Sequence, residues 1–452
     1  MTSLSSLNSQ QREAVTSING PVMILAGAGS GKTRVIIQRI AYLIQKKQVS
    51  PKQILAVTFT NKAAEEMRSR LNEILKGQRE GILLSTFHSL GVSLLRKSIH
   101  HLGYRSNFII YDKRDQISVI RTIMEDHDYD QSGLTDPKSV HYEISQAKSK
   151  GKAPEVFLEQ KESMEKQLIG KIFQQYQKIM KGCNAIDFED ILNFIVTLFE
   201  KKTDFMQSII DHYRYIMVDE YQDTNIIQYN LLRYMTKNHR NLCVVGDDDQ
   251  SIYGWRGAEV KNILDFENYF PEVKFIRLEQ NYRSTQKILT AANQVISQNT
   301  QRMPKKLWSK KNEGEKIDWL LANSEDDEMA AVARKIRSKI SHQGTRYIDY
   351  SILYRSNFQS RLIEEALSEA NIPYRILGGS SFYDREEIRD LLAYLKVINN
   401  TNDETSLQRI INTPRRGIGK ISLIKAKEYC QKMHQPLFYV MENAKKYKNI
   451  PR

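Results

Sequence analysis

Residues 26–33 read AGAGSGKT, between the apolar run VMILA and the helical pattern RVIIQRIAYLI. Glycines at Gly29 and Gly31 would let backbone N–H groups turn toward phosphate oxygens. Lys32 would then supply a cation to the β- and γ-phosphates, and Thr33 a hydroxyl to Mg²⁺. A chance GKT in a loop is the alternative, but the strand–loop–helix context favours a phosphate-binding loop. The candidate nucleotide-binding residues of this loop are Ala26, Gly27, Ala28, Gly29, Ser30, Gly31, Lys32 and Thr33.

Two acidic segments follow apolar runs and would complete such a site. Asp219 and Glu220 come directly after YIMV, at the end of an expected buried strand, where ligand chemistry collects in a parallel sheet. Asp219 would hold Mg²⁺ through water, and Glu220 would orient or deprotonate the attacking water. Acidic pairs usually mark only solvated surface, but the buried strand favours a catalytic role. Gln250 follows CVVG and three aspartates, where it would hydrogen-bond a γ-phosphate and sense hydrolysis.

These residues need a sheet to bring them together, and the apolar runs predict one. Short runs alternate with amphipathic helices such as 62–75, which predicts an α/β fold with a parallel sheet wrapped by helices. A Lys- and Gln-rich helical stretch from about 90 to 200 would form an inserted subdomain. The expected strands are 22–26, 54–59, 81–85, 215–218, 241–246 and 274–278.

A second α/β series is expected after residue 278, with strands at 317–321, 351–354 and 374–377. Residues 378–381 (GGSS) are typical of a hinge, since paired glycines permit backbone angles that other residues resist. Residues 405–452 are predicted to be helical, and they carry 11 Lys and Arg against 2 acids. This basic end would be a duplex-binding surface, or only the solvated face of helices whose neighbours are absent.

Composition narrows the class of protein. A chain of 452 residues predicts about three domains. The formal net charge of +14 favours a polyanionic partner, although a merely soluble basic surface would carry the same charge. Three scattered cysteines exclude a disulfide framework. So few cysteines are typical of a protein in a reducing, cytoplasmic location. No run of 18 apolar residues occurs, so no membrane partner is expected.

In this order the segments resemble the motifs of superfamily 1 helicases of the Rep, UvrD and PcrA family. The amino-acid sequence around STFHSLG and around the predicted hinge is most similar to that of the Rep type. Residues 7–14 resemble the Q motif, 26–33 motif I, 56–67 motif Ia, 85–91 motif Ib, 185–192 motif Id, 218–225 motif II, 245–258 motif III and 278–284 motif IV. Residues 352–357, 378–395 and 409–419 resemble the motifs that follow.

The resemblance implies a fold and its domain boundaries. It implies a RecA-like P-loop lobe (1A) at 1–90 and 200–280, interrupted by a helical insertion (1B) at 91–199. An incomplete second RecA-like lobe (2A) would follow at 281–378, and the start of a helical subdomain (2B) at 379–452.

The resemblance also implies roles at a site for ATP and Mg²⁺. Gln11 would read the adenine edge, while Arg34 and Tyr282 would sandwich the base. Outside this motif Tyr282 would be read as a core aromatic at a strand end. Arg283 would reach the γ-phosphate from the second lobe, and alanine at position 26 is usual in the family. The implied catalytic residues are Lys32, Asp219, Glu220, Gln250 and Arg283, and the implied metal ligands are Thr33 and Asp219.

A second set of residues is implied to bind single-stranded DNA. Aromatic faces spaced along a groove stack bases without reading them, at about 1–3 kcal/mol per base. Phe59 and Phe188 would otherwise be core residues, and His88 a structural histidine. Gly417 and Gly419 resemble a duplex-contacting turn flanked by Arg415, Arg416 and Lys420. The implied strand-contacting residues are Phe59, Asn61, His88, Phe188, Tyr253, Trp255, Arg256 and Arg355.

The function predicted from the resemblance is an ATP-dependent 3′–5′ DNA helicase and single-stranded DNA translocase of replication or repair. Its partners would be single-stranded DNA and single-strand/duplex junctions, with self-association and replication or repair partners left open. Family members are longer, and no motif V or VI occurs here, so the resemblance predicts a C-terminally truncated chain. One alternative is a remnant that binds ATP and single-stranded DNA without unwinding. Another is the motor half of a helicase–nuclease, whose nuclease cluster the sequence lacks.

Overall fold

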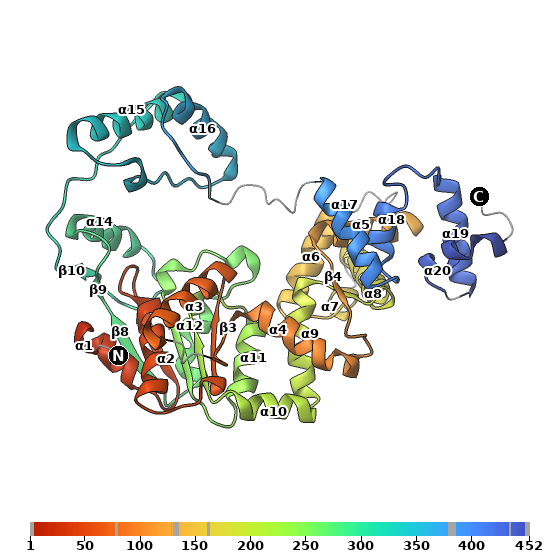
Figure 1. Cartoon of the computed structure of the whole chain (residues 1–452), viewed down its shortest axis with the longest axis horizontal. Coiled ribbons are helices and arrows are strands. Elements are labelled where there is room, and N and C mark those ends of the chain that lie inside the picture. Colours follow the sequence, from red (N-terminus) through yellow and green to blue (C-terminus); the bar gives the residue numbers. More distant parts are fainter. Residues whose placement is uncertain are drawn as a thin grey trace. The chain divides into compact units, whose positions relative to one another are not determined.

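The computed structural model describes residues 4–76, 80–127, 129, 135–160, 163–377, 386–433 and 435–447 (Figure 1). The chain divides into two compact units, and each is described by itself. Unit 1 comprises residues 1–314 and 393–452, and unit 2 comprises residues 315–392. The predicted hinge at 378–381 lies outside the described residues. None of the described helices is long and apolar enough to cross a membrane.

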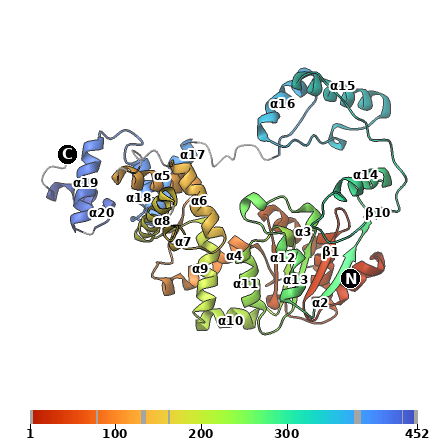
Figure 2. The same cartoon turned by 180° about the vertical axis from the view of Figure 1, so that it is seen from behind.

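Unit 1 is built on a six-stranded parallel sheet with the strand order β3-β2-β6-β7-β1-β8 (Figures 1 and 2). Each strand is confirmed within a few residues of its predicted bounds. Because all six strands run in the same direction, their carboxyl ends lie at one edge of the sheet. The residues predicted to form the nucleotide site follow the strands at this edge. The strands are β1 (Val22–Ala26), β2 (Ile54–Thr58), β3 (Leu83–Thr86), β6 (Tyr215–Val218), β7 (Leu242–Gly246) and β8 (Lys274–Leu278).

Alternate residues of each strand face opposite layers of helices. In β1, Ile24 belongs to one hydrophobic core together with helices α1, α2 and α3. Met23 and Leu25 belong to the opposite core with α4, α9 and α11. The strands are therefore apolar throughout, as expected for a parallel sheet covered on both faces. These helices are α1 (Ser9–Thr16), α2 (Lys32–Gln45), α3 (Asn61–Leu75), α4 (Phe87–Ser98), α9 (Phe188–Glu200) and α11 (Ile226–Thr236).

The predicted helical insertion has a hydrophobic core of its own. Ile120, Ile144 and Phe173 are buried together between its helices, and a short parallel pair of strands joins its two ends. Its elements are β4 (Ile109–Ile110), α5 (Lys113–Asp126), α6 (Pro137–Ser149), α7 (Glu155–Leu158), α8 (Met164–Gly182) and β5 (Ala185–Ile186). The remaining elements of this part of unit 1 are α10 (Asp204–His212), α12 (Lys261–Leu264), α13 (Phe266–Tyr269), β9 (Gln280–Asn281), α14 (Gln286–Ile296) and β10 (Trp308–Ser309).

A buried ion cluster fastens α6 of the insertion to the start of α9. The ammonium of Lys148 contacts the carboxylates of Asp187 and Asp190, and its side chain is only 4% exposed. Tyr176 donates a further hydrogen bond of 2.9 Å to Asp187. Burial alone would lower the pKa of Lys148, but the two carboxylates outweigh it and raise this pKa. The lysine therefore stays charged inside the protein.

We expect Lys148→Ala to destabilise this part of the fold by about 3–5 kcal/mol, because it leaves two buried carboxylates without their cation. Urea unfolding followed by circular dichroism measures the change. The matched control is Lys150→Ala, an exposed lysine just after the same helix, which should shift stability by less than about 0.5 kcal/mol. If both substitutions have equally small effects on stability, Lys148 does not balance two buried carboxylates.

Unit 2 does not contain the predicted strands. Helices α15 (Glu325–Gln343) and α16 (Ser360–Glu369) pack together through Ala333, Ile336 and Ile363. The segments 317–321, 351–354 and 374–377 form no strand among the described residues of the unit, so these three predictions are wrong for this structure. The apolar runs are present, but a parallel strand also needs a neighbouring backbone. Among the described residues no neighbouring strand is hydrogen-bonded to these segments. Residues 317–321 and 374–377 are exposed, and Ile352 and Tyr354 are partly buried against the two helices.

The C-terminal helices of unit 1 pack on the insertion through polar contacts. Tyr111 hydrogen-bonds Asp403 at 2.5 Å, and Asn400 donates to the carbonyl oxygen of Cys183 at 2.8 Å. The helices themselves share a small core that includes Leu407 and Val440. They are α17 (Glu386–Asn399, of which residues 393–399 belong to unit 1), α18 (Glu404–Ile410), α19 (Lys420–Met433) and α20 (Leu437–Glu442). The last three confirm the predicted helical character of the described chain after residue 405.

Candidate nucleotide site and nucleic-acid groove

The glycine-rich loop joins β1 to α2 as predicted. Gly29 and Gly31 have φ of +69° and +93°, angles that residues with a Cβ rarely adopt. Gly31 is the residue before the first turn of α2, so Lys32 and Thr33 begin the helix. The backbone N–H groups at this helix start are therefore available to an anionic ligand. Ser30 closes the loop by donating to the carbonyl oxygen of Gly27 at 2.7 Å.

The acidic pair predicted after β6 lies against this loop. Thr33 donates a hydrogen bond to Asp219 at 3.1 Å, and the ammonium of Lys32 is 3.0 Å from a carboxylate oxygen of Glu220. Glu220 has φ of +53°, a strained angle for a residue with a long side chain. Residues almost 190 positions apart are thus brought within hydrogen-bonding distance.

Electrostatics at this edge suits a divalent cation. Burial, and then the neighbouring charge of Glu220, raises the pKa of Asp219 to about 6. The same two causes raise the pKa of Asp223 to about 6, and one of its carboxylate oxygens is buried without a hydrogen-bond partner. Hard oxygen donors are the ligands that Mg²⁺ prefers. The hydroxyl of Thr33 and the carboxylate of Asp219 therefore fit this ion.

The predicted adenine-side residues lie on the other side of the loop. Gln11 is fully buried and donates to the carbonyl oxygen of Ser30 at 2.9 Å. Tyr282 is 42% exposed and accepts a hydrogen bond from Asn8 at 3.0 Å. Arg34 is also exposed and donates to Ser6. Two exposed planar groups thus flank a buried amide, an arrangement that suits a purine base.

Arg283 also belongs to this site. A Cβ built at Gly29 would lie 2.8 Å from the Cβ of Arg283, and the backbone N–H of Tyr282 donates to the carbonyl oxygen of Gly29 at 2.9 Å. The segment after β8 therefore passes directly over the phosphate loop. Arg283 has an exposed side chain, so this segment carries a positive charge next to the phosphate loop.

Gln250 is linked to the acidic pair through a chain of hydrogen bonds. Its amide donates to Asp247, whose backbone N–H donates to Gln222 at 3.0 Å. Gln222 in turn donates to Glu220 at 2.9 Å. Sequence reasoning did not single out Gln222, because its role depends on the neighbouring strand β7 rather than on its place in the chain.

Predicted DNA-contacting residues gather around one groove of about 670 Å³. Phe59, at the end of β2, stacks on Tyr253 with ring centroids 4.9 Å apart. The ring centroid of Trp255 lies 6.3 Å from that of Tyr253. His88 and Phe188 also line the groove, with ring centroids 5.4 Å apart. Trp255 is 63% exposed and Phe188 52%, so these two are not core residues. Exposed aromatic faces along a groove are typical of single-strand binding.

Helix α6 supplies a wall of the groove that sequence reasoning missed. His141, Tyr142, Ser145 and Gln146 line it, and Gln146 donates to the backbone oxygen of Trp255 at 3.3 Å. The amphipathic pattern of this helix, PKSVHYEISQAKS, contains no signal that separates these positions from an ordinary solvated face.

Other predicted DNA residues are not brought to the groove wall. Asn61 is exposed at the start of α3 and accepts from Ser89, whereas Arg355 is exposed in unit 2. The side chain of Arg256 lies outside the described part of the chain. Gly417, with φ of +74°, and Gly419 precede α19 as the glycine turn predicts.

The guanidinium of Arg416, beside this turn, is held by hydrogen bonds to the end of α18. Its guanidinium donates to the carbonyl oxygens of Ile410, Ile411 and Thr413 and to the hydroxyl of Tyr394. It thereby satisfies carbonyls at the end of α18, which a helix cannot pair by itself. Contact of the exposed Arg416 with a phosphate therefore stays a prediction, and it would compete with these bonds.

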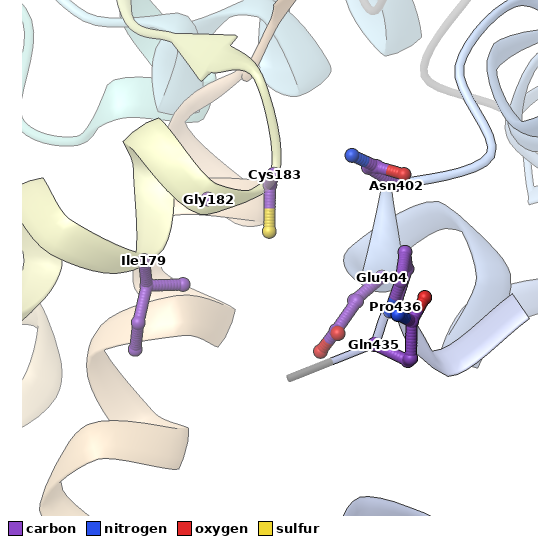
Figure 3. Close-up of a pocket in the computed structure, with 7 residues that line it drawn as sticks. All are labelled: Ile179, Gly182, Cys183, Asn402, Glu404, Gln435 and Pro436. Atoms are coloured by element: carbon purple, nitrogen blue, oxygen red, sulfur yellow. The ribbon is translucent and has the colours of Figure 1, made fainter. Parts of the chain in front are cut away.

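A second pocket, of about 360 Å³, contains none of the predicted site residues. Figure 3 shows Ile179 and Cys183 on one wall and Asn402, Glu404, Gln435 and Pro436 on the other. Burial raises the pKa of the Cys183 thiol, so this sulfur is not an activated nucleophile.

Comparison with known proteins decides the family. Residues 7–271 match the UvrD/REP helicase N-terminal domain, and residues 276–448 match the UvrD-like helicase C-terminal domain. The chain belongs to the UvrD/REP helicase family. The two matches together cover the sheet, the insertion, unit 2 and the C-terminal helices. The sequence-based recognition of this family and of its α/β fold is thereby confirmed.

Relatives of known name refine the assignment. The chain is 46% identical over 432 residues to the ATP-dependent DNA helicase PcrA of Staphylococcus epidermidis, covering 96% of this chain and 59% of that protein. It is 45% identical over 441 residues to PcrA of Staphylococcus aureus, covering 98% of this chain and 60% of that protein. These relatives are of the PcrA type, so the narrower prediction of the Rep type is wrong. The chain spans about 60% of the length of the curated relatives it matches.

Proposed function

We propose that this chain is an ATP-dependent DNA helicase motor that hydrolyses ATP between the phosphate loop and the acidic pair. The observation that carries the proposal is the convergence of Lys32, Thr33, Asp219 and Glu220 at one edge of the sheet. A phosphate cradle, a metal ligand and a base within hydrogen-bonding distance are the parts that phosphoryl transfer to water requires. The membership of the family and the similarity to proteins named ATP-dependent DNA helicase support it.

In this mechanism each residue has a distinct task. Lys32 and the N–H groups at the start of α2 bind the β- and γ-phosphates, and Glu220 accepts the proton of the attacking water. Thr33 and Asp219 would hold Mg²⁺, which neutralises charge developing on the phosphate oxygens. Gln250 contacts the γ-phosphate, and Arg283 approaches it from the segment over the loop. Gln11, Arg34 and Tyr282 hold the base.

The groove lined by Phe59, His88, Phe188 and Trp255 binds single-stranded DNA in the proposal. Gln250 lies three residues before Tyr253 and five before Trp255, in the same loop. A change at the γ-phosphate can therefore move the stacking residues directly. Asn61, Arg256 and Arg355 would add contacts to the strand, and Gly417 and Gly419 to the adjoining duplex.

Unwinding of the 3′–5′ type is tested with a partial duplex that carries a 3′ single-stranded tail. We expect ATP-dependent strand separation by the wild-type chain on this substrate and little on one with a 5′ tail. The second candidate is a protein that binds ATP and single-stranded DNA without unwinding. ATP and DNA binding with no strand separation on either substrate would overturn the helicase proposal and favour this second candidate.

His88 gives a prediction about pH. Burial lowers the pKa of its imidazole to about 4, so the ring is neutral above pH 5 and contributes stacking rather than charge. We expect the ratio of single-stranded DNA affinities of wild type and His88→Gln to stay constant between pH 7.5 and 5.5 in fluorescence titrations. A ratio that grows toward pH 5.5 would show that a protonated His88 binds phosphate, and would contradict this role.

The proposal includes domain boundaries, partners and location. Lobe 1A would comprise 1–90 and 200–280, subdomain 1B 91–199, lobe 2A 281–378 and subdomain 2B 379–452. The binding partners would be single-stranded DNA and single-strand/duplex junctions. The location would be the cytoplasm, in agreement with three scattered cysteines that are all free.

A further inference from the structure

Three consecutive aspartates at the end of β7 converge on one buried ammonium group. Lys305 lies 2.8 Å from Asp247, 2.5 Å from Asp248 and 2.7 Å from Asp249. Its side chain is 2% exposed, and the three carboxylates approach one another to within 4.8 Å. Such an acidic cluster would suit a metal ion, but the lysine occupies its centre. The charge of the cluster is therefore balanced by the protein itself.

Arg302 completes the arrangement. Its guanidinium makes a two-pronged contact with Asp249, at 2.8 and 2.7 Å, and its side chain is 15% exposed. The backbone N–H of Met303 donates to Asp248 at 2.7 Å. Burial lowers the pKa of Lys305, but Asp247 and hydrogen bonds to the three carboxylates outweigh it and raise this pKa. Both cations therefore remain charged at neutral pH.

The acidic cluster is continuous with the proposed ATP site. Asp247 accepts from the amide of Gln250 and, through its backbone N–H, contacts Gln222 next to Glu220. The segment that carries Lys305 also contacts the phosphate loop itself. A Cβ built at Gly27 of the phosphate loop would lie 2.2 Å from Leu307, two residues after Lys305. One segment thus touches both the phosphate loop and the loop of Gln250.

We propose that Lys305 and Arg302 are positioning residues that hold the Asp247–Gln250 loop in the register required for ATP hydrolysis and for its stimulation by single-stranded DNA. Without the cations, three carboxylates repel one another and Gln250 loses its fixed partner. Neither residue is placed to touch ATP, so each acts through the loop. The inference rests on the proposed function, because it concerns the same hydrolysis reaction.

The test compares Lys305→Met with Lys306→Met, an exposed neighbour that serves as the matched control. ATP hydrolysis is measured with and without single-stranded DNA and normalised to nucleotide-binding sites titrated with a fluorescent ATP analogue. We expect Lys305→Met to lower the DNA-stimulated kcat by about 10-fold or more and to leave KM for ATP within about 3-fold. Hydrogen exchange of residues 247–256 should rise in Lys305→Met and not in Lys306→Met, because the loop loses its anchor.

Because Lys305→Met leaves buried carboxylates unpaired, Arg302→Met and Arg302→Lys provide a second pair whose side chain reaches solvent. We expect Arg302→Met to lower kcat and Arg302→Lys to recover most of it, since the charge beside Asp249 is kept. A lower melting temperature with unchanged kcat per site in Lys305→Met and Arg302→Met would overturn the positioning role of these residues and leave the proposed function standing. A wild-type chain without Lys32-dependent hydrolysis would overturn the proposed function, and this inference with it.

Discussion

Glu220→Gln should abolish most ATP hydrolysis while leaving ATP binding intact. The carboxylate lies 3.0 Å from Lys32 at the edge of the sheet, and we propose that it accepts the proton of the attacking water. A neutral amide of the same shape cannot take that proton, and loss of a general base lowers kcat by about 10²- to 10⁴-fold. Because the charge of Glu220 raises the pKa of Asp219, the substitution should also favour the ionised form of Asp219. Binding of Mg²⁺ and ATP is therefore expected to be retained.

Single-turnover hydrolysis and equilibrium binding of a fluorescent ATP analogue, measured on the same preparation, separate these two effects. Glu267→Gln, an exposed glutamate on α13, is the matched control and should hydrolyse ATP like the wild type. If Glu220→Gln keeps more than about a tenth of the wild-type kcat, Glu220 is not the general base.

Lys32→Ala is expected to have the second large effect, and it should act on binding as well as on catalysis. Lys32 begins α2 beside the glycine loop, where we propose that its ammonium and the backbone N–H groups together bind the phosphates of ATP. Removal of one such charged donor costs about 10²- to 10³-fold in kcat. ATP affinity should fall too, because the same charge contacts ATP before and during the reaction.

The control for this substitution is Lys46→Ala, at the exposed far end of the same helix. It should leave both kcat and KM within about 2-fold, since helix-end charges act only over the last turn. Equal kcat values for Lys32→Ala and Lys46→Ala would show that any hydrolysis measured comes from another site or from a contaminating enzyme.

The proximity of the residues in the candidate nucleotide site was largely predictable because they follow strongly apolar strands. VMILA and YIMV could only be buried, and parallel strands bring their carboxyl ends to one edge. Thr33 and Asp219 therefore had to lie near each other. The roles of Tyr282 and Arg283 came from the resemblance alone, and the structure places both against the phosphate loop.

Other features could not be predicted, for physical reasons that differ. The contact between Lys305 and Asp248 joins residues 57 positions apart, and nothing in the composition of the connecting segment indicates a buried lysine. The strands expected at 317–321, 351–354 and 374–377 failed because an apolar run indicates burial but does not supply a neighbouring backbone. Arg416 was expected to contact phosphate, yet unpaired helix carbonyls compete for the same guanidinium.

We propose that the phosphate site and the aromatic groove work as one motor, and stimulation of ATP hydrolysis by single-stranded DNA measures this coupling. Hydrolysis is measured with and without single-stranded DNA for the wild type, Lys32→Ala, Trp255→Ala and the control Trp319→Ala, an 85% exposed tryptophan in unit 2. We expect a Lys32-dependent rate that single-stranded DNA stimulates in the wild type and in Trp319→Ala. In Trp255→Ala the DNA concentration for half-maximal stimulation should rise about 5- to 100-fold, as expected for the loss of one stacked base. A Lys32-dependent rate that single-stranded DNA does not change, or a Trp255→Ala response identical to that of Trp319→Ala, would exclude a motor that couples ATP hydrolysis to DNA bound at Trp255.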